Sequence, residues 1–86
     1  MANRGYYEAV KTEVIRQLQQ ERTRRKLSNY AVSQNSGVSE SMLGRIERGL
    51  RNPSFEVLLR VSDAIGADLP AIIKSAQRKV AATPRK

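Results

Sequence analysis

The side chains of this sequence that could do chemistry are polar donors and acceptors rather than nucleophiles or metal ligands. Its 86 residues include no cysteine and no histidine, so thiolates and the commonest general base are both missing. The sequence also lacks a glycine-rich phosphate loop and a convincing pair of carboxylates. We therefore expect no catalysis, no metal and no cofactor. The polar residues of greatest interest lie in the middle of the chain, at Glu40, Ser41 and Arg45.

The net charge of the chain is +8, from 16 basic and 8 acidic residues, and it favours an anionic partner. The excess lies in the flanks: residues 1–27 hold seven basic and three acidic residues, and residues 70–86 hold five basic and no acidic ones. Residues 28–69 are nearly neutral, with four basic and five acidic residues. Charge alone fits DNA, RNA and an acidic membrane equally well, so the motifs must distinguish these partners.

The elements that position the polar residues are predicted to be helices, because no run of residues alternates with a period of two. The five expected helices cover residues 6–25, 29–36, 40–48, 55–65 and 69–80. The fourth is apolar around much of its circumference, which predicts a central, buried helix. We expect one all-α domain over residues 1–80 and a basic, disordered tail over residues 81–86.

Serine and glycine residues mark the ends of the predicted helices. Ser28 and Ser39 are expected N-caps, because a serine hydroxyl accepts a hydrogen bond from a free backbone N–H. Gly37 and Gly49 follow the second and third helices, as helix-ending glycines do. Two short helices joined by a turn that contains glycine are typical of a helix-turn-helix, although an ordinary helical hairpin has the same outline.

The order of short motifs between residues 28 and 54 resembles that of a known family. Ser28 is followed by Gly-Val-Ser at 37–39, Ile-Glu-Arg-Gly at 46–49 and Asn-Pro-Ser at 52–54. In this order and spacing they resemble the phage repressor and Cro-like helix-turn-helix family, also called XRE-type, over about residues 14–73. The resemblance implies a five-helix, lambda-repressor-like fold that binds double-stranded operator DNA as a two-fold dimer, with the helix-turn-helix as helices 2 and 3.

The resemblance also assigns roles to individual residues. It implies an ion pair between Arg22, near the end of the first helix, and Glu47, which we interpret as structural rather than as a DNA contact. The family usually has a phosphate-contacting glutamine at the position of Asn29, and an alanine at the position of Ser33, where the two motif helices meet. We expect the small serine to preserve that packing, and the shorter asparagine to contact a phosphate.

Residues 40–48 would then form the recognition helix, with its polar face in the major groove. The predicted base-reading positions are Glu40, Ser41, Gly44 and Arg45. Arg45 can donate two hydrogen bonds to guanine, whereas Glu40 can accept one from cytosine or repel phosphate at wrong sites. Gly44, which costs about 1 kcal/mol in a helix relative to alanine, either lets the backbone approach DNA or is simply tolerated.

Phosphate contacts are predicted at the helix ends and in the following loop, where they position a protein without reading sequence. The residues assigned to this role are Ser28, Asn29, Ser39, Arg48, Arg51 and Asn52. Arg48 has an alternative role as a partner of the helix dipole. The basic run at the end of the first helix, Arg22 to Lys26, is either a solvated helix end or a further phosphate contact.

The apolar stripe of the last helix predicts a homodimer. We expect Leu69 and Ile72 to close the core of one chain, which leaves Ile73, Ala76 and Val80 for a second copy. An isologous interface of this kind would place two recognition helices about 34–36 Å apart on a pseudo-palindrome. The alternative is that all five residues pack within one chain.

Together these observations predict a sequence-specific transcriptional regulator of double-stranded DNA, such as a small repressor. The alternatives are an antitoxin or other protein-interaction module of the same fold, with a toxin or a polymerase as partner, and a non-specific binder of DNA or RNA. The N-terminus has no apolar signal-peptide segment, and the apolar stretch from Leu69 to Ile73 is too short to span a membrane. We therefore expect a cytoplasmic protein.

Overall fold

The computed structural model describes residues 4–82, and in that range the chain forms five helices and no strand. The helices are α1 (Arg4–Arg24), α2 (Asn29–Ser36), α3 (Glu40–Glu47), α4 (Phe55–Ile65) and α5 (Leu69–Ala82). The predicted all-α class is confirmed, and the helix ends differ from the prediction by two residues at most. Ala81 and Ala82 continue α5, so the tail does not begin where it was expected. The rest of that tail, residues 83–86, lies outside the described residues.

Serine caps fix the starts of the three short helices in the middle of the chain. The Ser28 hydroxyl accepts a hydrogen bond from the backbone N–H of Ala31 at 3.0 Å, and Ser39 and Ser54 cap α3 and α4 in the same way. Helix α2 ends at Gly37, whose φ of 76° is a left-handed conformation that glycine adopts without a Cβ clash. These local interactions explain why the predicted boundaries agree so closely with the observed ones.

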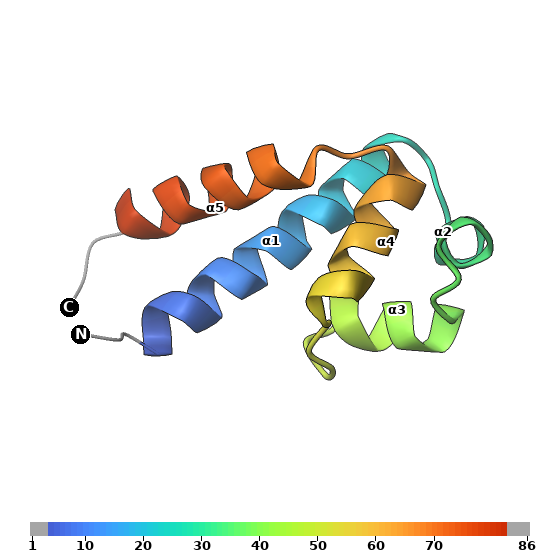
Figure 1. Ribbon diagram of the computed structural model, residues 1–86, viewed down its shortest axis with the longest axis horizontal. Helices are drawn as coiled ribbons and strands as arrows, with labels where there is room; N and C mark the ends of the chain where they lie inside the picture. The colour runs from blue at the N-terminus through green and yellow to red at the C-terminus, as the bar shows by residue number, and fades with distance from the viewer. Residues whose placement is uncertain (1–3, 83–86) are drawn as a thin grey trace.

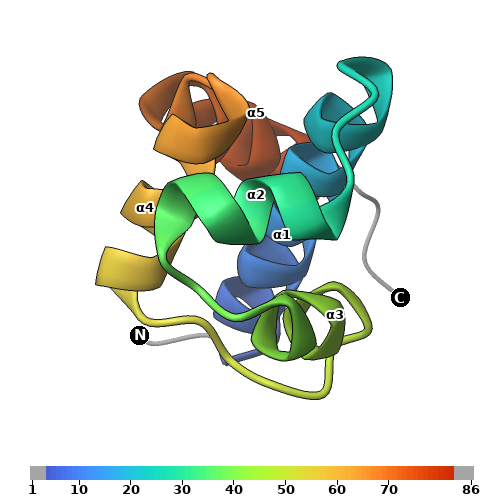
Figure 2. The same cartoon turned by 90° about the vertical axis from the view of Figure 1, so that its right-hand side faces the viewer.

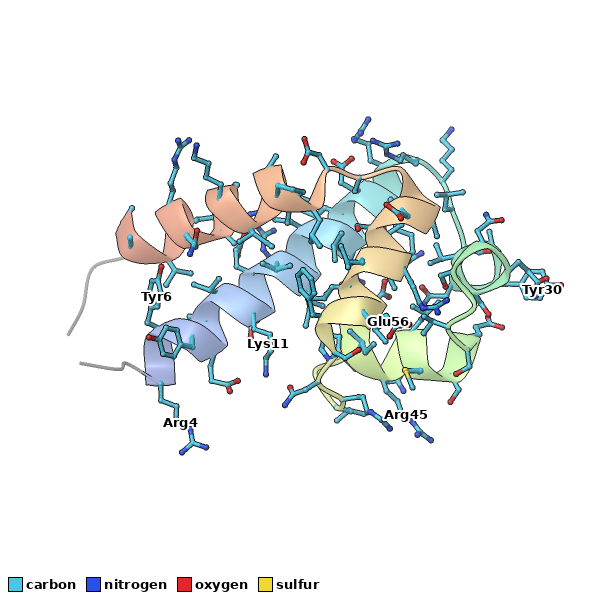
Figure 3. The ribbon with its side chains drawn as sticks, in the orientation of Figure 1. Arg4, Tyr6, Lys11, Tyr30, Arg45 and Glu56 are labelled. Carbon is cyan, nitrogen blue, oxygen red and sulfur yellow. The ribbon has the colours of Figure 1, made fainter. Side chains whose placement is uncertain are left out.

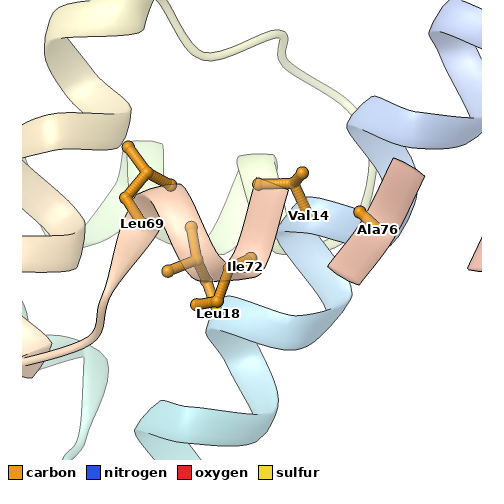
Figure 4. Packing of buried hydrophobic residues seen from close by; sticks show 5 residues of the cluster. All are labelled: Val14, Leu18, Leu69, Ile72 and Ala76. Carbon is orange, nitrogen blue, oxygen red and sulfur yellow. The ribbon is translucent and has the colours of Figure 1, made fainter. Parts of the chain in front are cut away.

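Two apolar clusters hold the five helices together. The first joins α1 to α5, and its buried members are Val14, Leu18, Leu69, Ile72 and Ala76 (Figure 4). The second lies among α2, α3 and α4, and its buried members are Val32, Val38, Leu43 and Ile65. Figure 1 shows α1 and α5 side by side, running in opposite directions, with the other three helices around the C-terminal half of α1. We call α1 and α5 the helical arm, and α2 to α4 the motif unit.

Most of the apolar stripe of α5 packs against α1, which removes Ala76 from the expected dimer surface, whereas the part of Ile73 and Val80 in that surface stays a prediction. Ala76 is completely buried within the chain, and Ile73 and Val80 are half-buried, with Ile73 packed against the same cluster. Ala76 therefore cannot contact a second copy. The physical reason is the length of α1, whose 21 residues extend far enough to cover α5.

The fourth helix is not buried on all sides, contrary to the prediction from its apolar composition. Phe55 is 66% exposed and Leu59 is 43% exposed, and residues four apart lie on one face of a helix. Only Ser62 and Ile65 of α4 are buried. Because α5 packs along α1, it leaves this face of α4 open.

Candidate nucleic-acid interface

Helix α3 buries an apolar face and exposes a polar one. Leu43 and Ile46 are 4% and 7% exposed and pack toward the other helices. The exposed side chains are Glu40, Ser41, Arg45 and Arg48. In Figure 3 the side chain of Arg45 extends from α3 away from the rest of the molecule. Three of the four predicted base-reading residues thus lie on one open surface, and the fourth, Gly44, is half-buried beside them.

The charged groups of this surface are available to a partner. Of the ion pairs within residues 4–82, none involves Glu40, Arg45 or Arg48. A carboxylate in the first turn and guanidinium groups in later turns offer both acceptors and bidentate donors. That combination matches the mixed donors and acceptors of base edges in a major groove.

A bidentate ion pair fixes α3 to α1. Arg22 donates from Nε and Nη2 to the Glu47 carboxylate at 2.8 and 3.1 Å, and its Nη1 donates to the carbonyl of Leu27 at 2.8 Å. The two side chains are only 17% and 18% exposed, so water competes weakly for these bonds. The structure therefore brings together the two residues that the resemblance pairs. We call this pair the Arg22–Glu47 clamp.

Asn29 turns inward and joins the Arg22–Glu47 clamp. Its Nδ2 donates to Glu47 Oε1 at 3.3 Å, and its Oδ1 is buried without a hydrogen-bond partner among residues 4–82. In this structure the side chain is engaged within the chain, and its predicted phosphate contact stays a prediction. An asparagine in the first turn of α2 is short enough to reach Glu47, and this contact across helices could not be inferred from its position in the sequence.

Ser28 and Ser39 lie exposed at the N-terminal ends of α2 and α3. Each hydroxyl oxygen accepts a capping hydrogen bond from the backbone, and its own proton remains able to donate to a phosphate. Free backbone N–H groups and the positive end of the helix dipole lie at the same places. The capping role and the predicted phosphate-contacting role are thus compatible.

The loop after α3 is tied to the N-terminal half of α1. Arg51 and Asn52 are exposed in this loop, and Lys11 donates to Asn52 Oδ1 at 2.6 Å. Lys11 also bonds Glu8 at 2.8 Å, which lowers the pKa of that carboxyl. Figure 3 shows Lys11 pointing from α1 toward the side of the molecule on which Arg45 lies. Sequence reasoning missed Lys11, because the contact joins positions 41 residues apart and no local pattern marks it.

The basic end of α1 is engaged by its own neighbours. Arg24 Nη2 and Arg25 Nε donate to Glu21 at 2.7 and 3.3 Å, and the hydrogen bond from Arg24 is the main cause of the lowered pKa of Glu21. Arg25 also donates to the carbonyl of Ile65 at 3.2 Å. Figures 1 and 2 place this end of α1 on the opposite side of the molecule from α3. The arrangement favours a solvated helix end over contact with the duplex that α3 would bind.

Comparison with known families identifies the class of the protein. A family model described as helix-turn-helix (HTH_3) matches residues 18–72, which is more than half of the chain. The chain therefore belongs to this helix-turn-helix family, the phage repressor and Cro-like or XRE-type class, and is a DNA-binding regulator. No curated protein and no solved structure gave a significant match.

Two further properties concern the described residues as a whole. None of the helices within residues 4–82 is long and apolar enough to cross a membrane. Over the same range, no group of three or more acidic side chains is placed so that it could hold a metal ion.

Proposed function

We propose that the protein is a sequence-specific transcriptional regulator that reads double-stranded DNA with α3 in the major groove. The observation that carries this proposal is the exposed polar face of α3, which the Arg22–Glu47 clamp holds in a fixed orientation. Orientation matters because a side chain discriminates between bases only when its donors are held close to the productive geometry. Arg45 and Ser41 project from this fixed helix and not from a mobile loop.

Each exposed residue has a role that its chemistry supports. Arg45 donates two hydrogen bonds to O6 and N7 of guanine, Glu40 accepts one from N4 of cytosine, and Ser41 bonds a base or a phosphate. Contacts from Ser28, Ser39, Arg51 and Asn52 to phosphates set the register of the protein on the duplex. Asn52 keeps its Nδ2 group for this purpose, because only its Oδ1 is used by Lys11.

We further propose that two copies bind the halves of a pseudo-palindrome, with the Phe55–Leu59 face of α4 as their contact. Large apolar side chains exposed together are a mark of interaction sites, and these two are 66% and 43% exposed. A two-fold contact would bury them on both copies at once.

We expect Phe55→Ser to weaken self-association in sedimentation and binding to a full palindrome, with half-site binding unchanged. A wild-type protein that stays monomeric with and without DNA would refute the dimer.

Repression is the mode of action that needs least from the molecule. Occupancy of an operator is enough to repress, whereas activation needs an additional surface that contacts polymerase. We therefore propose a repressor, acting in the cytoplasm because it must share a compartment with its DNA. The Phe55–Leu59 face also supports an alternative, in which the same fold binds another protein, such as a toxin, in place of a second copy.

Selection of binding sites from random-sequence duplexes tests the function directly. We expect the wild-type protein to enrich one motif, and Arg45→Ala to lose the preference at one base pair of each half-site. Binding should weaken steeply with salt, because phosphate contacts release counterions. Arg24→Ala is the control, since this exposed arginine in the last turn of α1 pairs with Glu21 of its own helix and should leave the motif unchanged. Enrichment of no motif by the wild type would indicate a non-specific binder.

A further inference from the structure

Arg48 lies on the same face of α3 as the predicted base-reading residues. Residues seven apart in a helix lie nearly above one another, so Arg48 shares its face with Ser41, and both are exposed. Arg48 is the C-cap of α3, and its φ of −88° and ψ of 2° lie in the bridge region beside the helical one, but its backbone N–H still bonds the carbonyl of Gly44 as in a helix. Its side chain therefore continues the pattern of the helix and does not point off the end.

The side chain of Arg48 folds back along α3 and covers Gly44. A Cβ atom added at Gly44 would lie 3.2 Å from Arg48 Nη1 and 3.9 Å from its Cζ. Gly44 is not among the glycines with positive φ, so its backbone conformation does not require glycine. Glycine is a poor residue for the middle of a helix. What its missing side chain provides here is room for the guanidinium group of Arg48.

We infer that Arg48 reads a base pair in the major groove, as a second guanidinium beside Arg45, and that Gly44 is a positioning residue that seats it. The inference rests on the proposed function. The folded side chain places Nη1 over the centre of the exposed face, one helical turn before its own Cα, where base edges would lie. An arginine that only contacted phosphate would extend from the end of the helix toward the backbone of the duplex.

The first test compares Arg48→Ala and Arg45→Ala with the wild type on random-sequence duplexes and then on the selected duplex with each base pair changed in turn. Arg48→Ala should bind the selected duplex on the order of tenfold more weakly. It should lose the preference at a different base pair from the one that Arg45→Ala affects. If Arg48→Ala instead binds all sequences more weakly by the same factor, and the dependence of log binding constant on log salt concentration becomes shallower by about one, Arg48 contacts a phosphate. That result would overturn the inference. If the wild type selects no motif, the proposed function fails as well, so the two failures are distinguishable.

The second test asks whether Gly44 acts through Arg48. Gly44→Ala should raise the melting temperature, because alanine is the better helix former, and should also weaken binding by relaxing the base pair that Arg48 reads. In an Arg48→Ala background, the same substitution should have no further effect on DNA binding. Equal weakening in both backgrounds would mean that the glycine lets the backbone approach DNA. An absence of any effect on binding in the wild-type background would mean that Gly44 is merely tolerated. Either result overturns the role of Gly44.

Discussion

The helical arm and the motif unit reach their stability by different routes. The arm consists of long helices, with 21 residues in α1 and 14 in α5, which pack along one another. The motif unit has helices of 8, 8 and 11 residues. Isolated helices shorter than about 12–15 residues are marginal in water. The surface proposed to contact DNA is thus built from the helices that are least stable in isolation, and the longest helix, α1, holds it in place.

The family match also distinguishes the helical arm from the motif unit. It covers residues 18–72, which includes the whole motif unit, the C-terminal part of α1 and only the first turn of α5. The N-terminal half of α1 and most of α5 lie outside it. In this chain those outer turns extend the arm, bury Ala76 and bring Lys11 to the loop after α3.

The largest expected effect comes from removing a buried leucine in either region. Leu18 and Leu43 are 5% and 4% exposed, one in each apolar cluster. Replacing either by alanine should lower the free energy of unfolding by about 2–5 kcal/mol, through lost burial and a cavity. Urea titration followed by circular dichroism should show one transition for both variants. A two-step transition in Leu18→Ala would mean that the arm unfolds separately from the motif unit.

The Arg22–Glu47 clamp is the connection between the two regions, and breaking it should have an intermediate effect. Arg22→Ala removes both guanidinium donors from a carboxylate that is 18% exposed and leaves it only the Asn29 amide, which should cost about 1–3 kcal/mol of unfolding free energy. Binding to the selected duplex should weaken as well, because α3 is no longer fixed to α1. Arg24→Ala removes an exposed arginine from the same helix and should change neither quantity measurably. A loss of stability without loss of DNA affinity would show that α3 does not need the clamp for its orientation.

The smallest expected effect concerns charge within the arm. The pKa of Glu13 is lowered to about 2, chiefly by its hydrogen bond from Arg16, and Lys79 of α5 lies 3.5 Å away. Because the folded pKa lies below the ordinary value of 4.5, this stabilisation is present above about pH 4.5 and is lost as the pH falls toward 2. Glu13→Gln should lower the melting temperature slightly at pH 7, and the difference should vanish near pH 2. A difference that is constant over this range would point to packing instead.

The features that could be predicted from the sequence are those that local interactions determine, such as the starts of the helices. Helix starts depend on a serine and the N–H three residues later, so Ser28 and Ser39 could be assigned from the sequence. The polar face of α3 follows from helical periodicity in the same way. What the sequence did not predict depends on distant contacts: the burial of Ala76 requires the full length of α1, and the hydrogen bond from Asn29 requires Glu47, 18 positions away. The position of Arg48 over Gly44 depends on a side-chain conformation, which residue types alone do not define.

The hydrogen bond from Lys11 to Asn52 has a consequence for the energetics of association. It joins α1 to the loop between α3 and α4, across 41 positions of the chain. A loop that is free in solution loses conformational entropy when it settles on a partner, at a cost of about 1–2 kcal/mol for each residue that becomes ordered. In this protein the loop around Asn52 is already restrained when the chain has folded. Fewer residues of the loop then lose conformational freedom on binding, so the proposed phosphate contacts of Arg51 and Asn52 would contribute more of their interaction energy to affinity.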